Sequence, residues 1–84
     1  MATTKEDIRG WFEDGVKKGA THMIVVCDTY DHEDFPVYVM PGESVHKEFD
    51  KHREPNIHME KVMEVYSLDV DMEFQLNERM AFHF

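Results

Sequence analysis

The segment THMIVVCDT, at residues 21–29, contains five consecutive apolar residues, Met23 to Cys27. Successive side chains of a β-strand point to opposite faces of a sheet. Met23, Val25 and Cys27 would therefore face one way, and the two apolar side chains between them the other. Apolar residues on both faces are typical of a central strand that is covered on both sides. We therefore expect this segment to lie in the middle of a sheet.

A second strand is predicted for residues 35–40, FPVYVM, after a short polar loop at residues 30–34. So short a connection favours an antiparallel hairpin with the first strand. Pro36 lacks the N–H that a hydrogen-bonded ladder needs, which favours a strand start or an edge strand.

A helix is predicted before this hairpin, over residues 4–18. Thr3 or Thr4 can cap its start, and Thr3 precedes Glu6 by three residues, the spacing of a capping box. Gly19 follows as a C-terminal stop, since glycine readily adopts the left-handed conformation that ends helices. The apolar stripe at helical spacing consists of Ile8, Trp11, Phe12 and Val16.

Three more elements are predicted after the hairpin. A second helix, capped by Ser44, spans residues 44–54, and its narrow apolar ridge predicts light packing on the surface. Residues 58–67 could form a helix, but their β-branched and aromatic content favours a strand. A last helix is predicted for residues 69–82. The order α-β-β-α-β-α predicts a single α+β domain with helices packed on a three-stranded sheet, in which the place of the third strand stays open.

The last predicted helix would be apolar on more than one side. In so short a chain, burial on all sides is difficult to achieve, so this pattern predicts self-association into a homo-oligomer. The candidate interface residues are Met72, Leu76, Met80, Phe82 and Phe84. The alternative is that Phe82 folds back onto its own domain.

Length and charge limit the classes of function. The chain has 84 residues, enough for one small domain, and a formal net charge of -9. This charge argues against direct binding to nucleic acid or to anionic membranes, which carry the same sign. The chain shows neither an apolar run of bilayer length nor a signal peptide, so the cytoplasm is the expected location.

The densest group of candidate binding residues follows the first strand. Residues 28–34 hold four carboxylates and no Lys or Arg. The candidate binding residues here are Asp28, Tyr30, Asp31, Glu33, Asp34, Phe35 and Tyr38. Carboxylates of this kind could bind a basic surface or a hard cation such as Ca²⁺ or Mg²⁺, although the EF-hand spacing is missing. The aromatic rings could stack on a nucleotide-like molecule if Arg or Lys from a neighbouring subunit bound its phosphates. The alternative is a solvated hairpin loop.

No motif in the sequence indicates catalysis. Neither a phosphate-binding glycine loop nor a nucleophile elbow occurs. Cys27 is the only cysteine, which excludes an intrachain disulfide, and the acidic residues near it disfavour a thiolate. Six histidines are present, but no His-x-x-x-His pair falls within a predicted helix. We therefore predict a protein that is not an enzyme and has neither a cofactor nor a metal site.

Four stretches of the chain carry a resemblance. They are GATHMIVVCDTY at residues 19–30, HEDFPVYV at 32–39, VMEVY at 62–66 and AFHF at 81–84. In these stretches the chain resembles a small protein family of bacteriophage and prophage genomes. The resemblance supplies no catalytic motif. It implies a context, because small phage accessory proteins commonly act on host machinery by binding, and many inhibit defence systems.

Together these observations predict a non-enzymatic, phage-type accessory protein of anti-defence character. It would neutralise a host factor by binding a basic surface, such as one that normally holds nucleic acid. The acidic surface would comprise Asp28, Asp31, Glu33, Asp34, Glu60, Glu64, Asp69 and Glu73. Two alternatives are an oligomeric module that sequesters a nucleotide-like signal molecule, and a metal-binding protein that uses the acidic loop at residues 28–34.

Overall fold

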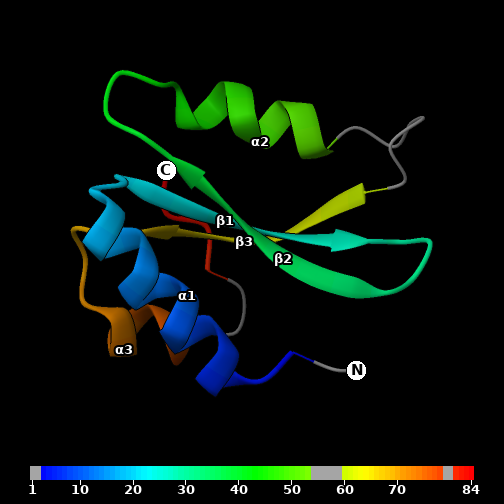
Figure 1. Cartoon of the computed structure of the whole chain (residues 1–84), viewed down its shortest axis with the longest axis horizontal. Helices are drawn as coiled ribbons and strands as arrows, with labels where there is room; N and C mark the ends of the chain where they lie inside the picture. The colour runs from blue at the N-terminus through cyan, green and yellow to red at the C-terminus, as the bar shows by residue number, and fades with distance from the viewer. Residues whose placement is uncertain (1–2, 54–59, 79–80) are drawn as a thin grey trace.

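The computed structural model describes residues 3–53, 60–78 and 81–84. In chain order the elements are α1 (Lys5–Lys18), β1 (His22–Asp28), β2 (Glu33–Val39), α2 (Val45–Arg53), β3 (Glu60–Ser67) and α3 (Met72–Leu76) (Figure 1). The predicted α-β-β-α-β-α order and the α+β class with a three-stranded sheet are thereby confirmed.

The sheet has the strand order β2-β1-β3, and both outer strands run antiparallel to β1. β1 is therefore the central strand, and its residues 23–27 are buried, as predicted. β2 forms one edge, where Pro36 lies opposite Val25. Of the two predicted places for this proline, a strand start or an edge strand, the structure shows the edge strand. Proline has no N–H to donate to a neighbouring strand, so an edge tolerates it. β3 takes the place that the sequence pattern left open, on the far side of β1.

A bulge in β3 adjusts which side chains reach each face. The pairing with β1 shifts between Val25 and Val26, and Met63 has no partner across the ladder. One extra residue in a strand reverses the alternation of side chains beyond it. Val62 and Val65 therefore both pack into the core on the α2 side although they are three residues apart.

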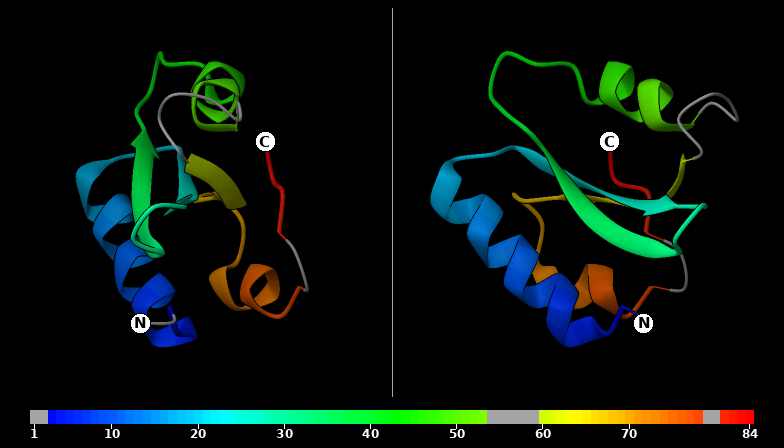
Figure 2. Two further views of the ribbon diagram at one scale, coloured as in Figure 1. Left: turned by 90° about the vertical axis from the view of Figure 1, so that its right-hand side faces the viewer. Right: turned by 45° about the vertical axis from the view of Figure 1, so that its right-hand side comes forward.

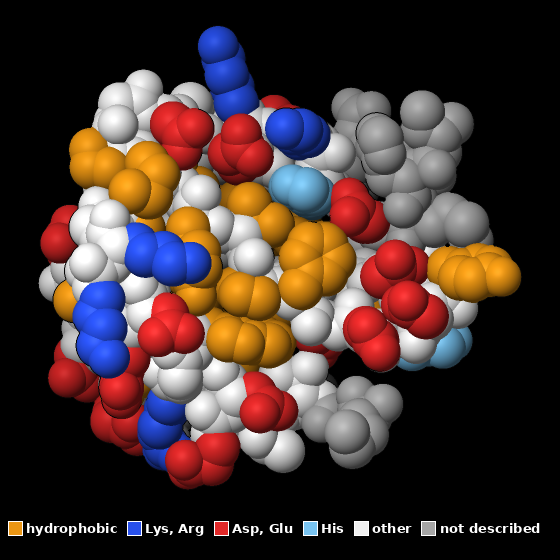
Figure 3. All heavy atoms as spheres, viewed as in Figure 1, with side chains coloured by type: hydrophobic (Ala, Val, Ile, Leu, Met, Phe, Trp, Pro, Cys, Tyr) orange, Lys and Arg blue, Asp and Glu red, His pale blue; other side chains and the backbone are white. Residues whose placement is uncertain are grey.

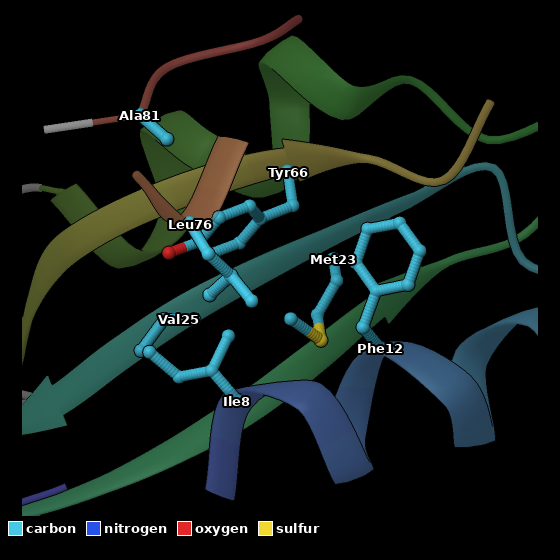
Figure 4. Packing of buried hydrophobic residues seen from close by; sticks show 7 residues of the cluster. All are labelled: Ile8, Phe12, Met23, Val25, Tyr66, Leu76 and Ala81. Carbon is cyan, nitrogen blue, oxygen red and sulfur yellow. The ribbon is translucent and has the colours of Figure 1, made fainter. Parts of the chain in front are cut away.

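The helices cover the sheet on both faces (Figure 2). α1 and α3 lie on one face, and α2 lies on the other. The residues buried on the α1 side are Ile8, Phe12, Met23, Val25, Tyr66, Leu76 and Ala81 (Figure 4). Those buried on the α2 side are Ile24, Val26, Val39 and Val65. The alternation of β1 divides these two clusters as predicted.

The caps of α1 differ in one position from the prediction. Thr4, not Thr3, closes the box: its Oγ1 accepts from the Asp7 N–H at 3.2 Å, and Asp7 Oδ2 accepts from the Thr4 N–H at 3.0 Å. The reason is that the helix begins at Lys5, which places Asp7 and not Glu6 at its third position. Gly19 ends the helix with a φ of 79°, in agreement with the prediction.

The surface of α1 that faces the sheet contains a glycine. A Cβ at Gly15 would lie 2.8 Å from Cε1 of Tyr38 and 2.9 Å from Cδ1 of Leu68, so a larger residue there would force these side chains to shift. Val16, which the sequence placed in the apolar stripe, is instead 53% exposed. The face of α1 that packs on the sheet therefore includes Gly15 and not Val16. Tyr38 of β2 and Leu68, just after β3, come close to the helix at Gly15.

α2 is capped and packed as the sequence predicted. The Lys47 N–H donates to Ser44 Oγ at 3.3 Å. Val45 and Phe49, which form its apolar ridge, are half-buried against the core of the α2 side. The light packing of this helix leaves its outer surface in solvent.

The prediction of a long last helix over residues 69–82 is wrong. α3 comprises only Met72–Leu76, and residues 81–84 run beside β3 as a parallel bridge between Val65 and Phe82. Backbone groups of this segment form hydrogen bonds with the outer edge of β3 instead of with a helix. The spacing of apolar residues along the chain does not reveal such a partner. Ala81 is buried beneath the sheet while Phe82 faces α2, as expected for extended backbone. Met80 lies outside the described residues.

Candidate functional site

The hairpin turn between β1 and β2 is ordered by its own carboxylates. Asp28 Oδ1 accepts from the Tyr30 N–H at 2.8 Å, and Asp31 Oδ1 accepts from the Glu33 N–H at 3.3 Å. The His32 N–H donates to the Asp28 carbonyl at 2.8 Å, with His32 in the left-handed region at φ 59°. Short polar side chains commonly hold turns in this way. The turn thus has a defined shape, and it holds Tyr30 outward with 78% of its surface exposed.

Five carboxylates gather at this end of the sheet. The strand register places Asp28 opposite Glu33 in β2 and opposite Glu60 in β3. Asp31 and Asp34 belong to the same hairpin. We call these five residues the acidic sheet end, and Figure 3 shows acidic side chains grouped in the region of the β1–β2 turn. This part of the predicted acidic surface is therefore brought together by the fold.

The remaining predicted acidic residues lie elsewhere. Glu64 accepts a hydrogen bond from the buried Tyr66 hydroxyl at 2.8 Å. Glu73, in α3, forms a two-point ion pair with Arg9 of α1, at 2.8 Å and 2.9 Å. Asp69 follows the opposite end of β3. Glu64 and Glu73 thus support the structure on the α1 side. None of the three carboxylates extends the acidic sheet end.

Cys27 lies next to the acidic sheet end but is buried. Burial, followed by the hydrogen bond and charge of Asp34, raises the pKa of its thiol. The Sγ donates to the Asp28 carbonyl at 3.6 Å. These surroundings favour the protonated thiol, which is the weaker nucleophile.

The structure does not bring the three candidate aromatic residues together. Phe35 packs on the α2 side of the sheet, whereas Tyr38 packs on the α1 side. The Tyr38 hydroxyl donates to the Trp11 carbonyl at 2.7 Å, and Lys18 Nζ lies 4.7 Å from the centre of the tyrosine ring. Burial, and then the charge of Asp14, raises the pKa of Tyr38. Tyr30 alone of the three is exposed, so a single chain does not place these rings where they could stack together on a nucleotide-like molecule.

The candidate interface residues are divided between two layers. Leu76 is only 5% exposed and belongs to the core, and Met72 packs against that core. The apolar side chain that α3 leaves in solvent is Phe74, at 61% exposed. Phe82 and Phe84 lie instead against α2, on the far side of the sheet. The four members of the predicted set that the structure describes thus form no single surface, because α3 ends before the segment that carries the two phenylalanines. Self-association itself stays a prediction.

The histidines have contacts that the sequence did not indicate. His52 Nδ1 lies 2.9 Å from Glu60 Oε1, which links α2 to β3. His83 Nε2 lies 2.9 Å from Glu78 Oε1. His46 stacks on Phe84 with ring centres 4.7 Å apart.

Within the described ranges, no group of three or more His, Cys, Asp or Glu side chains is arranged to hold a metal ion. The metal-binding alternative therefore lacks a ligand set in that part of the chain.

Sequence reasoning missed the residues that contact Phe82 and Phe84. Phe49 meets both rings edge-on, with ring centres 6.2 Å and 4.9 Å apart. The available signal was the alternation of aromatic residues in AFHF, which is typical of extended backbone. That signal was outweighed by the helical spacing of the residues before it.

Comparisons with protein-family models, curated proteins and solved structures find no match to this chain. In the part of the chain that the structure describes, no helix combines the length and the apolar character needed to cross a membrane.

Proposed function

We propose that the chain is a non-enzymatic binding protein whose acidic sheet end docks on a basic surface of a host protein, with Tyr30 as its apolar anchor. The observation that carries this proposal is the position of Tyr30. Tyr30 is 78% exposed at the tip of a turn that two carboxylates hold in shape. By occupying the basic surface, the protein would keep the host factor from its normal ligand, in the manner of a phage accessory protein.

Tyrosine suits this role because it combines a large contact area with few rotatable bonds. Tyrosine is among the residues that contribute most to binding at interfaces, where charged rims add less. The turn is ordered before binding by the bonds to the Tyr30 and Glu33 amides, so little conformational freedom is lost on docking. Affinity is therefore assigned mainly to Tyr30.

The carboxylates determine which partner is recognised. A concentrated negative field speeds the approach of a basic surface and repels acidic ones. A basic surface built to bind phosphate groups would accept the carboxylates of the acidic sheet end in their place. A host site that normally holds nucleic acid is therefore the expected target.

The experiment is retention of host proteins from a bacterial extract on immobilised protein. The wild-type chain is compared with Tyr30→Ser and with the double variant Asp31→Asn/Glu33→Gln. The matched control is Glu13→Gln/Asp14→Asn, which removes two exposed carboxylates from α1 and changes the net charge equally. Asparagine at position 31 keeps an oxygen acceptor for the turn, and thermal unfolding checks that each variant is folded.

We expect one basic protein to be retained by the wild type and by the control, and to be retained clearly less by Tyr30→Ser and by Asp31→Asn/Glu33→Gln. A short DNA duplex should elute it. The proposal would be wrong if both double variants lost the retained protein equally, because net charge alone would then explain retention. It would also be wrong if Tyr30→Ser retained it fully.

A further inference from the structure

The outer edge of β3 is occupied by two pieces of the same chain. The Ser67 N–H donates to Gln75 Oε1 at 2.8 Å, and Gln75 Nε2 donates back to the Ser67 carbonyl at 2.9 Å. Two residues along, the Val65 N–H donates to the Ala81 carbonyl at 2.8 Å, and the His83 N–H donates to the Val65 carbonyl at 2.9 Å. A side-chain amide and a short extended segment thus cover the last part of an edge that would otherwise be open to pairing.

The side chains of residues 81–84 pack on both faces of the sheet: Ala81 on the α1 side, and Phe82 and Phe84 against α2. Ala81 is fully buried on the α1 side, within the core cluster there. Phe84 stacks on His46 with ring centres 4.7 Å apart and planes 6° apart, and it meets Phe49 edge-on at 4.9 Å. Phe82 also meets Phe49 edge-on. We call the position formed by Val65, His46 and Phe49 the β3–α2 slot.

The backbone of the segment is attached to the sheet at one point. Both of its backbone bonds to β3 involve one residue, Val65. Ala81 is buried, but Phe82 and Phe84 remain 39% and 46% exposed. Segments with few backbone bonds and exposed side chains belong to the parts of a protein that open most readily. The slot is therefore expected to open without unfolding of the sheet.

We propose that the β3–α2 slot also accepts residues 81–84 of a second copy of the chain. The occupant is identified by its fit, because the structure shows this very segment seated with a small residue inward and two aromatic residues toward α2. Exchange between copies re-forms the same backbone bonds and ring contacts, so its cost is that of bringing two chains together. The chain's own residues 81–84 compete for the slot, and their covalent attachment gives them an effective concentration of roughly millimolar. The exchanged form should therefore increase as the protein concentration approaches that range.

The test uses full-length chains that can be cross-linked only across the slot. His46→Cys and Phe84→Cys are prepared separately, mixed in equal amounts and oxidised mildly. Cys27 is kept, because it is buried and its environment favours the thiol. The control mixture pairs Phe84→Cys with Val16→Cys, an exposed position on α1 in the other layer. A chain that carries both His46→Cys and Phe84→Cys shows whether the geometry allows the bond within one molecule.

We expect the slot pair to give at least about tenfold more mixed dimer than the control pair, with a yield that rises with concentration. Phe49→Ala in both chains should remove this excess. The proposal is overturned if the slot pair gives no more dimer than the control while the doubly substituted chain closes on itself. Native mass spectrometry of the wild type provides a second readout. A chain that is monomeric up to about millimolar concentration overturns the proposal whatever the cross-linking yield.

Discussion

The sheet face under α1 and α3 is covered by a helix capped at both ends, whereas the face under α2 is covered by a lightly packed helix and two partly exposed phenylalanines. Among the described residues, seven apolar residues are buried on the first face and four on the second. An ion pair between Arg9 and Glu73 also joins α1 to α3. The difference indicates that most of the stability resides on the α1 side, and that the α2 side can change its contacts at lower cost.

The largest expected effect compares one phenylalanine from each face. Phe12 is 6% exposed in the α1-side core, whereas Phe49 is half-buried on α2. Phe12→Ala should lower the free energy of unfolding by about 3–5 kcal/mol, since a buried ring leaves a cavity. Phe49→Ala should cost clearly less, since its ring already contacts solvent. Urea unfolding measures both, with Phe12→Leu as a milder variant if Phe12→Ala does not fold. Equal losses would remove the distinction between the faces.

The next effect concerns the residue that attaches α3 to the edge of β3. Gln75 is fully buried, and its amide bonds both backbone groups of Ser67. Gln75→Leu would keep the volume but leave those groups unpaired, at a cost of about 1–3 kcal/mol in the free energy of unfolding. Phe84→Ala, at the exposed end of the β3–α2 slot, is the comparison and should cost less. If Gln75→Leu leaves the free energy of unfolding in urea unchanged, the Gln75 amide is not needed at this edge.

Two glycines of α1 distinguish close packing from helix propensity. A Cβ at Gly15 would meet Tyr38 and Leu68 within 3 Å, whereas one at Gly10 would meet nothing within 4 Å. Gly15→Ala should therefore destabilise the protein by about 1–3 kcal/mol through overpacking. Gly10→Ala should stabilise it by about 0.5–1 kcal/mol, because alanine favours helix. Thermal unfolding of the two variants should give shifts of opposite sign, and shifts of the same sign would contradict the close approach of β2 to α1.

The smallest expected effect is the pH dependence of the Arg9–Glu73 pair. The hydrogen bond from Arg9 lowers the pKa of the Glu73 carboxyl. A carboxyl whose pKa is lower in the folded state stabilises the fold above its unfolded pKa of roughly 4.3, and this contribution disappears as the pH falls through the folded pKa. Between about pH 5 and pH 3 the Tm of the wild type should fall more than that of Glu73→Gln. Parallel curves would show that this exposed pair does not contribute.

The parts of the fold that were predicted correctly depend on local patterns. The alternation of residues 21–29, the short connection to the next strand and the caps of the first helix each involve neighbouring residues. The last helix was predicted wrongly because residues 81–84 obtain their backbone partners from Val65, sixteen residues earlier for Ala81. Pairing of this kind does not leave a periodic pattern in the segment itself. The bulge at Met63 escaped prediction for the same reason.

In the candidate site, too, only the features that depend on neighbouring residues could be predicted from the sequence. The acidic turn follows from the hairpin, so the grouping of Asp28, Asp31 and Glu33 could be read from the sequence. Phe35 and Tyr38 are three residues apart in one strand, so their opposite faces could also have been read from the alternation. The exposure of Tyr30 depends on the shape of the turn, and the approach of Glu60 depends on the place of β3 in the sheet. Neither follows from local pattern.

The most direct test of the proposed function is a salt series on the host protein retained by the immobilised chain, comparing the wild type with Tyr30→Ser and with Asp31→Asn/Glu33→Gln. Tyr30→Ser should weaken retention at every salt concentration but keep the wild-type salt dependence, because it removes apolar contact and no charge. Asp31→Asn/Glu33→Gln should reduce the salt dependence itself, because fewer charges remain to be screened. If retention by the wild type does not change between low and high salt, the acidic sheet end is not the docking surface.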